Sequence, residues 1–232
     1  MAVPPWNGGD GQHPLDLGPK LIDVSDKIAF VYHMVPNDLR GNVIYPLNQL
    51  VAIHADLYEQ QKAKYINREA SMDFRIPGID VLWNSTVHCA PLHPYFIRRA
   101  REKVGIVPLS PLPLLAFKIP LDRILVHPVV WYWCRTFWIN GAPGENVPLT
   151  PPLDEFEPFD AARYKELADV TAGYVPYLGR MKERGERPLT FPQIPHVLVA
   201  GPIDISGLSI VRWDAPPGSA AADLTVPHRG LR

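Results

Sequence analysis

Two segments of this 232-residue sequence carry polar side chains of the kinds used in catalysis or ligand binding. The first is the pair Tyr32-His33, in the middle of the apolar run 28–35. On a strand, one ring nitrogen of His33 can hold a ligand hydroxyl while the other is fixed by the backbone. The alternative for His33 is a half-buried structural histidine.

The second segment, 83–94, is the densest group of polar and aromatic residues in the chain. Its candidates for substrate binding are Trp83, Asn84 and His88. His88, Cys89 and His93 are residues of the kinds that bind zinc. However, all three lie in one loop, and without a second pair of ligands elsewhere their spacing matches known zinc sites poorly. We therefore expect no metal site here. We expect instead a turn that caps the following helix, with one or two of its polar groups facing a pocket.

Three further residues have two interpretations each. Arg68 either forms a surface ion pair with Glu69 or binds phosphate or carboxylate through two guanidinium nitrogens. Tyr45 is either a core residue or a stacking surface. His196 begins a very apolar strand after Pro195, and either belongs to an active site or caps the preceding loop.

The elements that must position these residues are short. Runs of β-branched and aromatic residues predict strands at 28–35, 79–83, 114–119, 129–137, 196–200 and 208–213. Apolar spacing of three and four predicts a helix over 47–66, and capping signals predict helices over 94–104, 160–170 and 176–185. Strands outnumber helices and do not alternate with them, which favours an α+β fold: a mixed, mostly antiparallel sheet with a few short flanking helices.

Composition limits the classes of protein to which the chain can belong. With 47% hydrophobic and 20% charged residues, it can fill a core. A net charge of -1 argues against a broad basic face for nucleic acid, although a local groove remains open. We expect an N-terminal arm over 1–27, one domain over 28–214 and a flexible tail over 215–232, because both ends are rich in chain-breaking residues.

Several common motifs are absent from the sequence. It contains no Gly-x-Gly-x-x-Gly, no Gly-Lys-Ser/Thr phosphate loop and no Gly-x-Ser-x-Gly. Its two cysteines exclude a disulfide framework, and neither a signal peptide nor a membrane-spanning stretch is recognisable. We therefore expect a cytoplasmic protein that does not contact a membrane.

Several short motifs together resemble a family of uncharacterised bacterial proteins. They are Tyr-His-Met-Val-Pro (32–36), Tyr-Pro-Leu-Asn (45–48), Arg-Glu (68–69), Leu-Trp-Asn (82–84) with His88, and Pro-His-Val-Leu-Val (195–199). This resemblance implies no activity.

A second resemblance does imply an activity. The first strand with its histidine, the loop and helix that follow, and the late Val-Leu-Val strand before Gly-Pro-Ile-Asp-Ile are similar to ADP-ribosyltransferases of the DarT and RNA 2′-phosphotransferase type. In that fold the histidine binds the ribose of NAD, an arginine binds its phosphates and aromatic residues flank the nicotinamide. The resemblance thus implies His33 for the ribose, Arg68 for phosphate and Tyr45 for stacking.

The sequence departs from this family at one position. DarT-type enzymes carry a catalytic glutamate on the late strand, where this chain has Pro195-His196. The phosphotransferase branch does without that glutamate, so either His196 has another catalytic role or activity is lost.

These residues support three functional interpretations. The first is an NAD-using transferase that modifies a nucleic acid or a protein. The second is a non-enzymatic module that binds a nucleotide or a partner through the 83–93 loop. The third is a hydrolase or isomerase that uses His33 and His88 as acid and base.

Overall fold

The protein is described by a computed structural model that covers residues 29–66, 69–106, 114–135, 150–219 and 223–225, the last three by their backbone alone. Its strands are β1 (Phe30–Met34), β2 (Val43–Ile44), β3 (Arg75–Ile76), β4 (Val81–Leu82), β5 (Val87–Cys89), β6 (Leu115–Pro120), β7 (Val129–Tyr132), β8 (Phe156–Pro158), β9 (His196–Val199), β10 (Ile203–Asp204), β11 (Ser209–Arg212) and β12 (Asp223–Thr225). Its α-helices are α1 (Leu47–Ile53), α2 (Ala55–Lys62), α3 (Pro94–Lys103), α4 (Leu121–Ile124) and α5 (Tyr174–Glu183). Short 3-10 helices are η1 (Ala63–Tyr65), η2 (Glu69–Ser71), η3 (Trp83–Ser85) and η4 (Leu153–Glu155).

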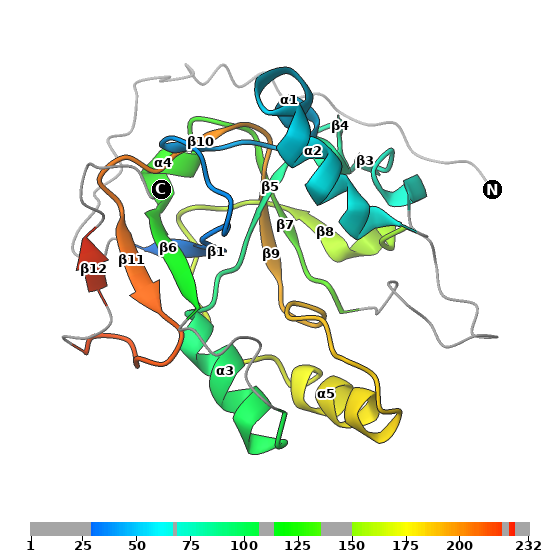
Figure 1. The fold of residues 1–232 in the computed structure, drawn as a ribbon, viewed down its shortest axis with the longest axis vertical. Helices are drawn as coiled ribbons and strands as arrows, with labels where there is room; N and C mark the ends of the chain where they lie inside the picture. The colour runs from blue at the N-terminus through cyan, green and yellow to red at the C-terminus, as the bar shows by residue number, and fades with distance from the viewer. Residues whose placement is uncertain (1–28, 67–68, 107–113, 136–149, 220–222, 226–232) are drawn as a thin grey trace, which may run out of the picture.

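Two four-stranded antiparallel sheets form the centre of the fold. Their strand orders are β1-β6-β11-β12 and β5-β9-β7-β8, and two-stranded pairs β10-β2 and β3-β4 flank them (Figure 1). The α+β class, with antiparallel sheets and few short helices, is therefore confirmed.

The two sheets are joined where β1 meets β5. Tyr32 and Ala90 form an antiparallel bridge, in which each backbone N–H donates to the other's carbonyl oxygen at 2.8 Å. β1 and β9, which come from opposite ends of the described chain, therefore lie on either side of β5.

Side-chain alternation along the strands divides the core into clusters. Val31, Val87, Cys89, Val197 and Val199 are buried together on one face. Residues that alternate with them belong to other clusters, such as Tyr32 and Ala90 against α3 and α5, and Leu198 beneath Trp83. Successive strand side chains point to opposite faces, so the sheet carries apolar cores on both sides.

The two longest helices end at the glycines that the sequence suggested. In α3, Gly105 has a φ of 70° and its N–H donates to Glu102, while the N–H of Ile106 donates to Arg101. Gly185 has a φ of 67° after α5, and the same pair of bonds recurs there. These are Schellman caps, which favour glycine because it adopts positive φ without steric cost. The helices predicted over 94–104 and 176–185 are confirmed, although α5 begins two residues before Pro176.

The single helix predicted over 47–66 is wrong, because the chain breaks it at His54. His54 has a φ of -146°, yet its N–H donates to Leu50 and its carbonyl accepts from Tyr58. It therefore ends α1 and begins α2, and the chain then continues into η1.

The helix predicted over 160–170 does not form. Asp160 accepts backbone N–H bonds from Ala162 and Arg163, as a helix cap would, but the turn stops there. The next residues bind β1 instead: the Glu166 carboxylate accepts from the Phe30 N–H at 3.0 Å and from the Tyr32 hydroxyl at 2.8 Å. Contacts with a distant strand thus replace local helical hydrogen bonds.

Several strands are shorter than the sequence indicated, and one lies in an unexpected place. The run predicted over 129–137 is a strand only to Tyr132, and residues 136 and 137 lie outside the described residues, as does the N-terminal arm 1–27. The segment expected to be a C-terminal tail contains β12, which pairs with β11. Among the described residues, no helix combines the length and apolar character needed to cross a bilayer.

Candidate functional site

Two of the candidate histidines meet across neighbouring strands. His196 at the start of β9 lies opposite Tyr132 of β7, and His88 of β5 lies opposite Leu198 of β9. Residues 196 and 198 share a face, so this register places both imidazoles on one side of the sheet. Their ring centroids are 6.0 Å apart.

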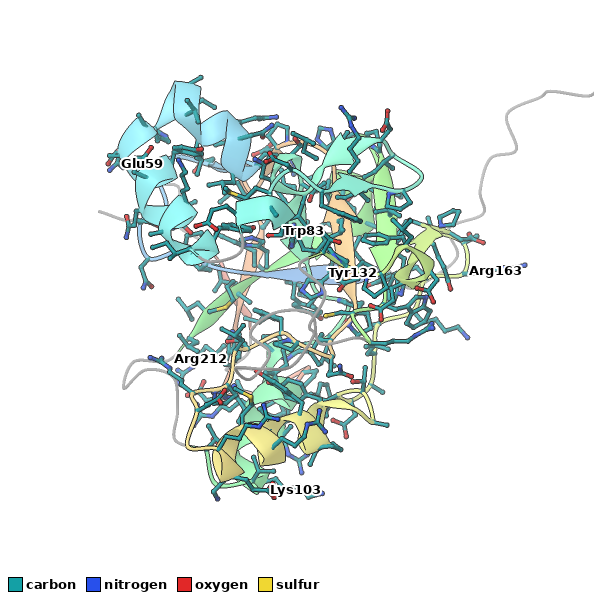
Figure 2. All side chains as sticks on the ribbon, turned by 90° about the vertical axis from the view of Figure 1, so that its right-hand side faces the viewer. Glu59, Trp83, Lys103, Tyr132, Arg163 and Arg212 are labelled. Carbon is teal, nitrogen blue, oxygen red and sulfur yellow. The ribbon has the colours of Figure 1, made fainter. Side chains whose placement is uncertain are left out.

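Aromatic rings surround this histidine pair. Trp83 meets His88 edge to face at 4.5 Å and Tyr132 at 5.6 Å, and Figure 2 shows the two labelled rings close together in the molecule. Tyr132 lies 5.8 Å and Phe191 6.1 Å from His196, measured between ring centroids. The structure therefore brings together three predicted residues, Trp83, His88 and His196.

His196 is neutral at physiological pH. Burial lowers its pKa to about 4, against a smaller opposing effect of the Ile194 backbone. Within the part of the chain that the structure describes, its buried Nδ1 forms no hydrogen bond of good geometry. A neutral imidazole can donate or accept a hydrogen bond, but it does not replace the negative charge of a glutamate.

The turn η3 places Trp83 against the histidine pair, and Asn84 follows it in the chain. The Trp83 carbonyl accepts from the Thr86 hydroxyl at 2.8 Å and faces His88 Nε2 at 3.5 Å. The buried Oδ1 of Asn84 accepts no hydrogen bond from any described residue. Since a buried carbonyl oxygen without a partner costs free energy, Asn84 is a candidate acceptor for a ligand donor.

His33 lies on the neighbouring sheet and is held by its own strand. Its Nδ1 donates to the Met34 carbonyl at 2.7 Å, which places the ring proton on Nδ1. Nε2 is left as an acceptor, and no described residue bonds to it. Burial lowers the pKa of His33 to about 4; the Met34 hydrogen bond opposes this, and the positive charge of Lys64 adds to it.

His33 is outside the ring contacts that join His88 and His196. Along β1 it alternates with Tyr32, which shares the face of Ala90 and hence of His88. Two residues of η1 face these two regions. The charge of Lys64 contributes to the lowered pKa of His33, and Tyr65 packs against the cluster of Trp83 and Tyr132. The structure thus directs His33 and the His88–His196 pair to different faces where β1 and β5 meet.

The structure describes one of the two remaining candidates, Tyr45, and not the other, Arg68. Tyr45 is half-buried directly after β2, and Asn48, three residues further on, donates from Nδ2 to Ser85 Oγ of η3 at 2.8 Å. Arg68 lies outside the described residues.

Of the three zinc-capable residues, Cys89 and His93 have structural positions. Cys89 is fully buried, and burial raises the pKa of its thiol to about 12. His93 caps α3, because its Nδ1 accepts from the Tyr95 N–H at 3.3 Å. Within the described part of the chain, no three His, Cys, Asp or Glu side chains are grouped as a metal site would require.

Tyr132 and Lys64 belong to this region but were not singled out from the sequence. Tyr132 was expected on a strand, and only the register between β7 and β9 identifies it as the partner of His196. Lys64 gave no sequence signal beyond lying on a helix face.

Comparison of the chain with known proteins found no matching family model, no similar curated protein and no similar solved structure.

Proposed function

We propose that the protein binds NAD as a substrate and transfers ADP-ribose to a nucleic acid or protein acceptor. The observation that carries the proposal is the fixed tautomer of His33. Its Nδ1–H is bound to Met34, so its Nε2 offers an acceptor to a ribose hydroxyl. This is the role that the resemblance to ADP-ribosyltransferases implies for a first-strand histidine.

The arrangement of strands supports the same proposal. The resemblance rests on β1 near the start of the chain and on β9 near its end. These strands are separated only by β5. The residues of β1 and β9 on which the resemblance depends therefore lie one strand apart.

The chemistry requires positioning more than a strong nucleophile. The bond between the ribose C1′ and the nicotinamide nitrogen breaks, and nicotinamide leaves with the electron pair. The acceptor atom forms the new bond to C1′ and, if it was neutral, loses a proton to solvent. Positive charge develops on the ribose in the transition state, so fixed dipoles and hydrogen bonds to the ribose hydroxyls lower the barrier.

His196 occupies the position where DarT-type enzymes carry glutamate, and it cannot provide that residue's charge. Its low pKa also makes it a poor base at neutral pH. His196 shares the face of His88 and not that of His33, so we assign it no contact with a ribose held by His33. An acceptor that is already ionised would need no base.

Calorimetric titration with millimolar NAD tests the proposal. Wild type should release heat, and His33→Ala should bind NAD about tenfold more weakly, because one hydrogen bond is lost. His54→Ala is the matched control, since His54 joins α1 to α2 and caps neither helix with its side chain. An absence of heat with folded wild type would overturn the proposal.

A non-enzymatic binding module is the second candidate. The observation that favours it is the neutral His196 in place of a catalytic carboxylate. The two functions are separated by measuring nicotinamide released from NAD in the presence of candidate acceptors. A module would bind NAD or another nucleotide without releasing nicotinamide. The hydrolase alternative has less support, because strand alternation directs His33 and His88 to different faces where β1 and β5 meet.

A further inference from the structure

Positive charge is concentrated on α3, α5 and the turns that end them. Residues 94–106 and 174–190 contain eight basic and three acidic residues, in a chain whose net charge is -1. The basic residues are Arg98, Arg99, Arg101, Lys103, Arg180, Lys182, Arg184 and Arg187, and the acidic ones are Glu102, Glu183 and Glu186. The rest of the sequence is therefore acidic overall.

The two helices form one unit at one end of the molecule (Figure 1), and Lys103 is at its tip in Figure 2. Arg101 is only 4% exposed, and its Nη1 donates to the Leu189 carbonyl that follows α5. Lys182 of α5 donates to the Val104 carbonyl at the end of α3, at 2.7 Å. These two bonds join α3 to the segment after α5 and α5 to the end of α3, so the basic residues of both helices belong to one packed unit.

Some of these basic side chains are not neutralised by a described acidic residue. Lys103, Arg180 and Arg187 are exposed and form no ion pair with a described residue. Arg99 is exposed as well, with its guanidinium 5.7 Å from the centre of the Tyr95 ring. By contrast, Arg98 is paired with Glu102 at 2.6 Å.

We propose that this basic surface, defined by Arg99, Lys103, Arg180 and Arg187, binds the phosphate backbone of a nucleic acid. A ten-residue helix is about 15 Å long. Along the axis of a DNA duplex, one strand presents a phosphate about every 3.4 Å, so each helix is long enough to contact more than one phosphate. The surface is defined by positive charge, so we expect it to contact phosphates rather than to read sequence. This proposal does not depend on NAD binding.

Fluorescence anisotropy with a labelled single-stranded oligonucleotide of mixed sequence tests the proposal on the full chain. The test variant is Lys103→Gln, Arg180→Gln and Arg187→Gln combined. The control combines Lys62→Gln, Arg163→Gln and Lys165→Gln, which removes the same charge away from α3 and α5. Circular dichroism and melting confirm that both variants are folded.

Wild type should bind with an affinity that falls as salt rises. The test variant should bind at least about tenfold more weakly, and the slope of log K against log salt should become shallower by about 2. The control should resemble wild type. No binding by wild type, equal loss in both variants, or equal competition by poly-glutamate and by unlabelled oligonucleotide would each overturn the proposal.

Discussion

His196 lies directly across the β7–β9 pair from Tyr132, with the two ring centroids 5.8 Å apart. The imidazole is enclosed by aromatic side chains, and so it remains neutral when the protein is folded. In the unfolded chain the same histidine would titrate near its ordinary pKa of about 6.5.

This difference predicts a loss of stability in mild acid. The folded pKa of His196 and that of His33 are both lowered to about 4, so the unfolded state binds more protons between about pH 6.5 and 4. The free energy of unfolding should therefore be highest above pH 6.5 and fall as the pH drops to 4, by roughly 1–3 kcal/mol for each histidine. Urea unfolding at a series of pH values measures this fall.

The variant His196→Phe gives the matching control. It keeps an aromatic ring but removes the proton site, so the dependence on pH should become shallower. If wild type and His196→Phe lose stability equally across this range, His196 is not the neutral buried group described above.

Glu166 should matter for stability although it lies in a segment without helix or strand. Its carboxylate accepts from the Phe30 N–H and the Tyr32 hydroxyl. Glu166→Gln should lower the free energy of unfolding by about 1–3 kcal/mol, because charge-assisted bonds to a carboxylate are replaced by weaker ones. Glu183→Gln on the exposed face of α5 should change it by less than about 0.5 kcal/mol. Equal effects of the two changes would contradict this assignment.

Two glycines in the α3–α5 unit should respond to alanine in opposite directions. At Gly105 the φ of 70° and a Lys182 Nζ 3.0 Å from an added Cβ make Gly105→Ala destabilising by about 1 kcal/mol or more. Gly179 lies inside α5, and an added Cβ meets nothing within 4 Å. Gly179→Ala should stabilise by up to about 1 kcal/mol, because alanine favours helix. Thermal melting of both variants measures these changes, and a stabilised Gly105→Ala would contradict the cap.

The two cysteines should be inert in the folded protein. Burial raises the pKa of Cys89 to about 12 and that of Cys134 to about 11, so neither forms a thiolate at neutral pH. A thiol reagent should therefore label the chain slowly until urea unfolds it. Rapid labelling of folded protein would show that one thiol is accessible.

Local signals in the sequence were sufficient for some of these elements. Pro94 and Gly105 delimit α3, and the apolar residues after His196 indicate β9, because these patterns act within a few residues. Tertiary contacts decided the rest. Glu166 and Tyr164 attach their segment to β1 in place of a helix, and His54 splits a periodic stretch that looks continuous.

The candidate site was predictable in its residue types but not in its pairing. His88 and Trp83 stood out in one loop, and their proximity follows from short sequence separation. The approach of His88 to His196 depends on the order β5-β9-β7, which joins residues more than a hundred positions apart. No periodicity in the sequence specifies that order.

The side-chain ¹⁵N NMR spectrum of His33 is the most direct test of the central claim. The signals are assigned by their loss in His33→Gln. At pH 7 we expect a neutral ring with its proton on Nδ1, and an Nε2 resonance that moves when millimolar NAD is added while Nδ1 stays protonated. A proton on Nε2, or an Nε2 resonance that NAD leaves unchanged, would contradict the account.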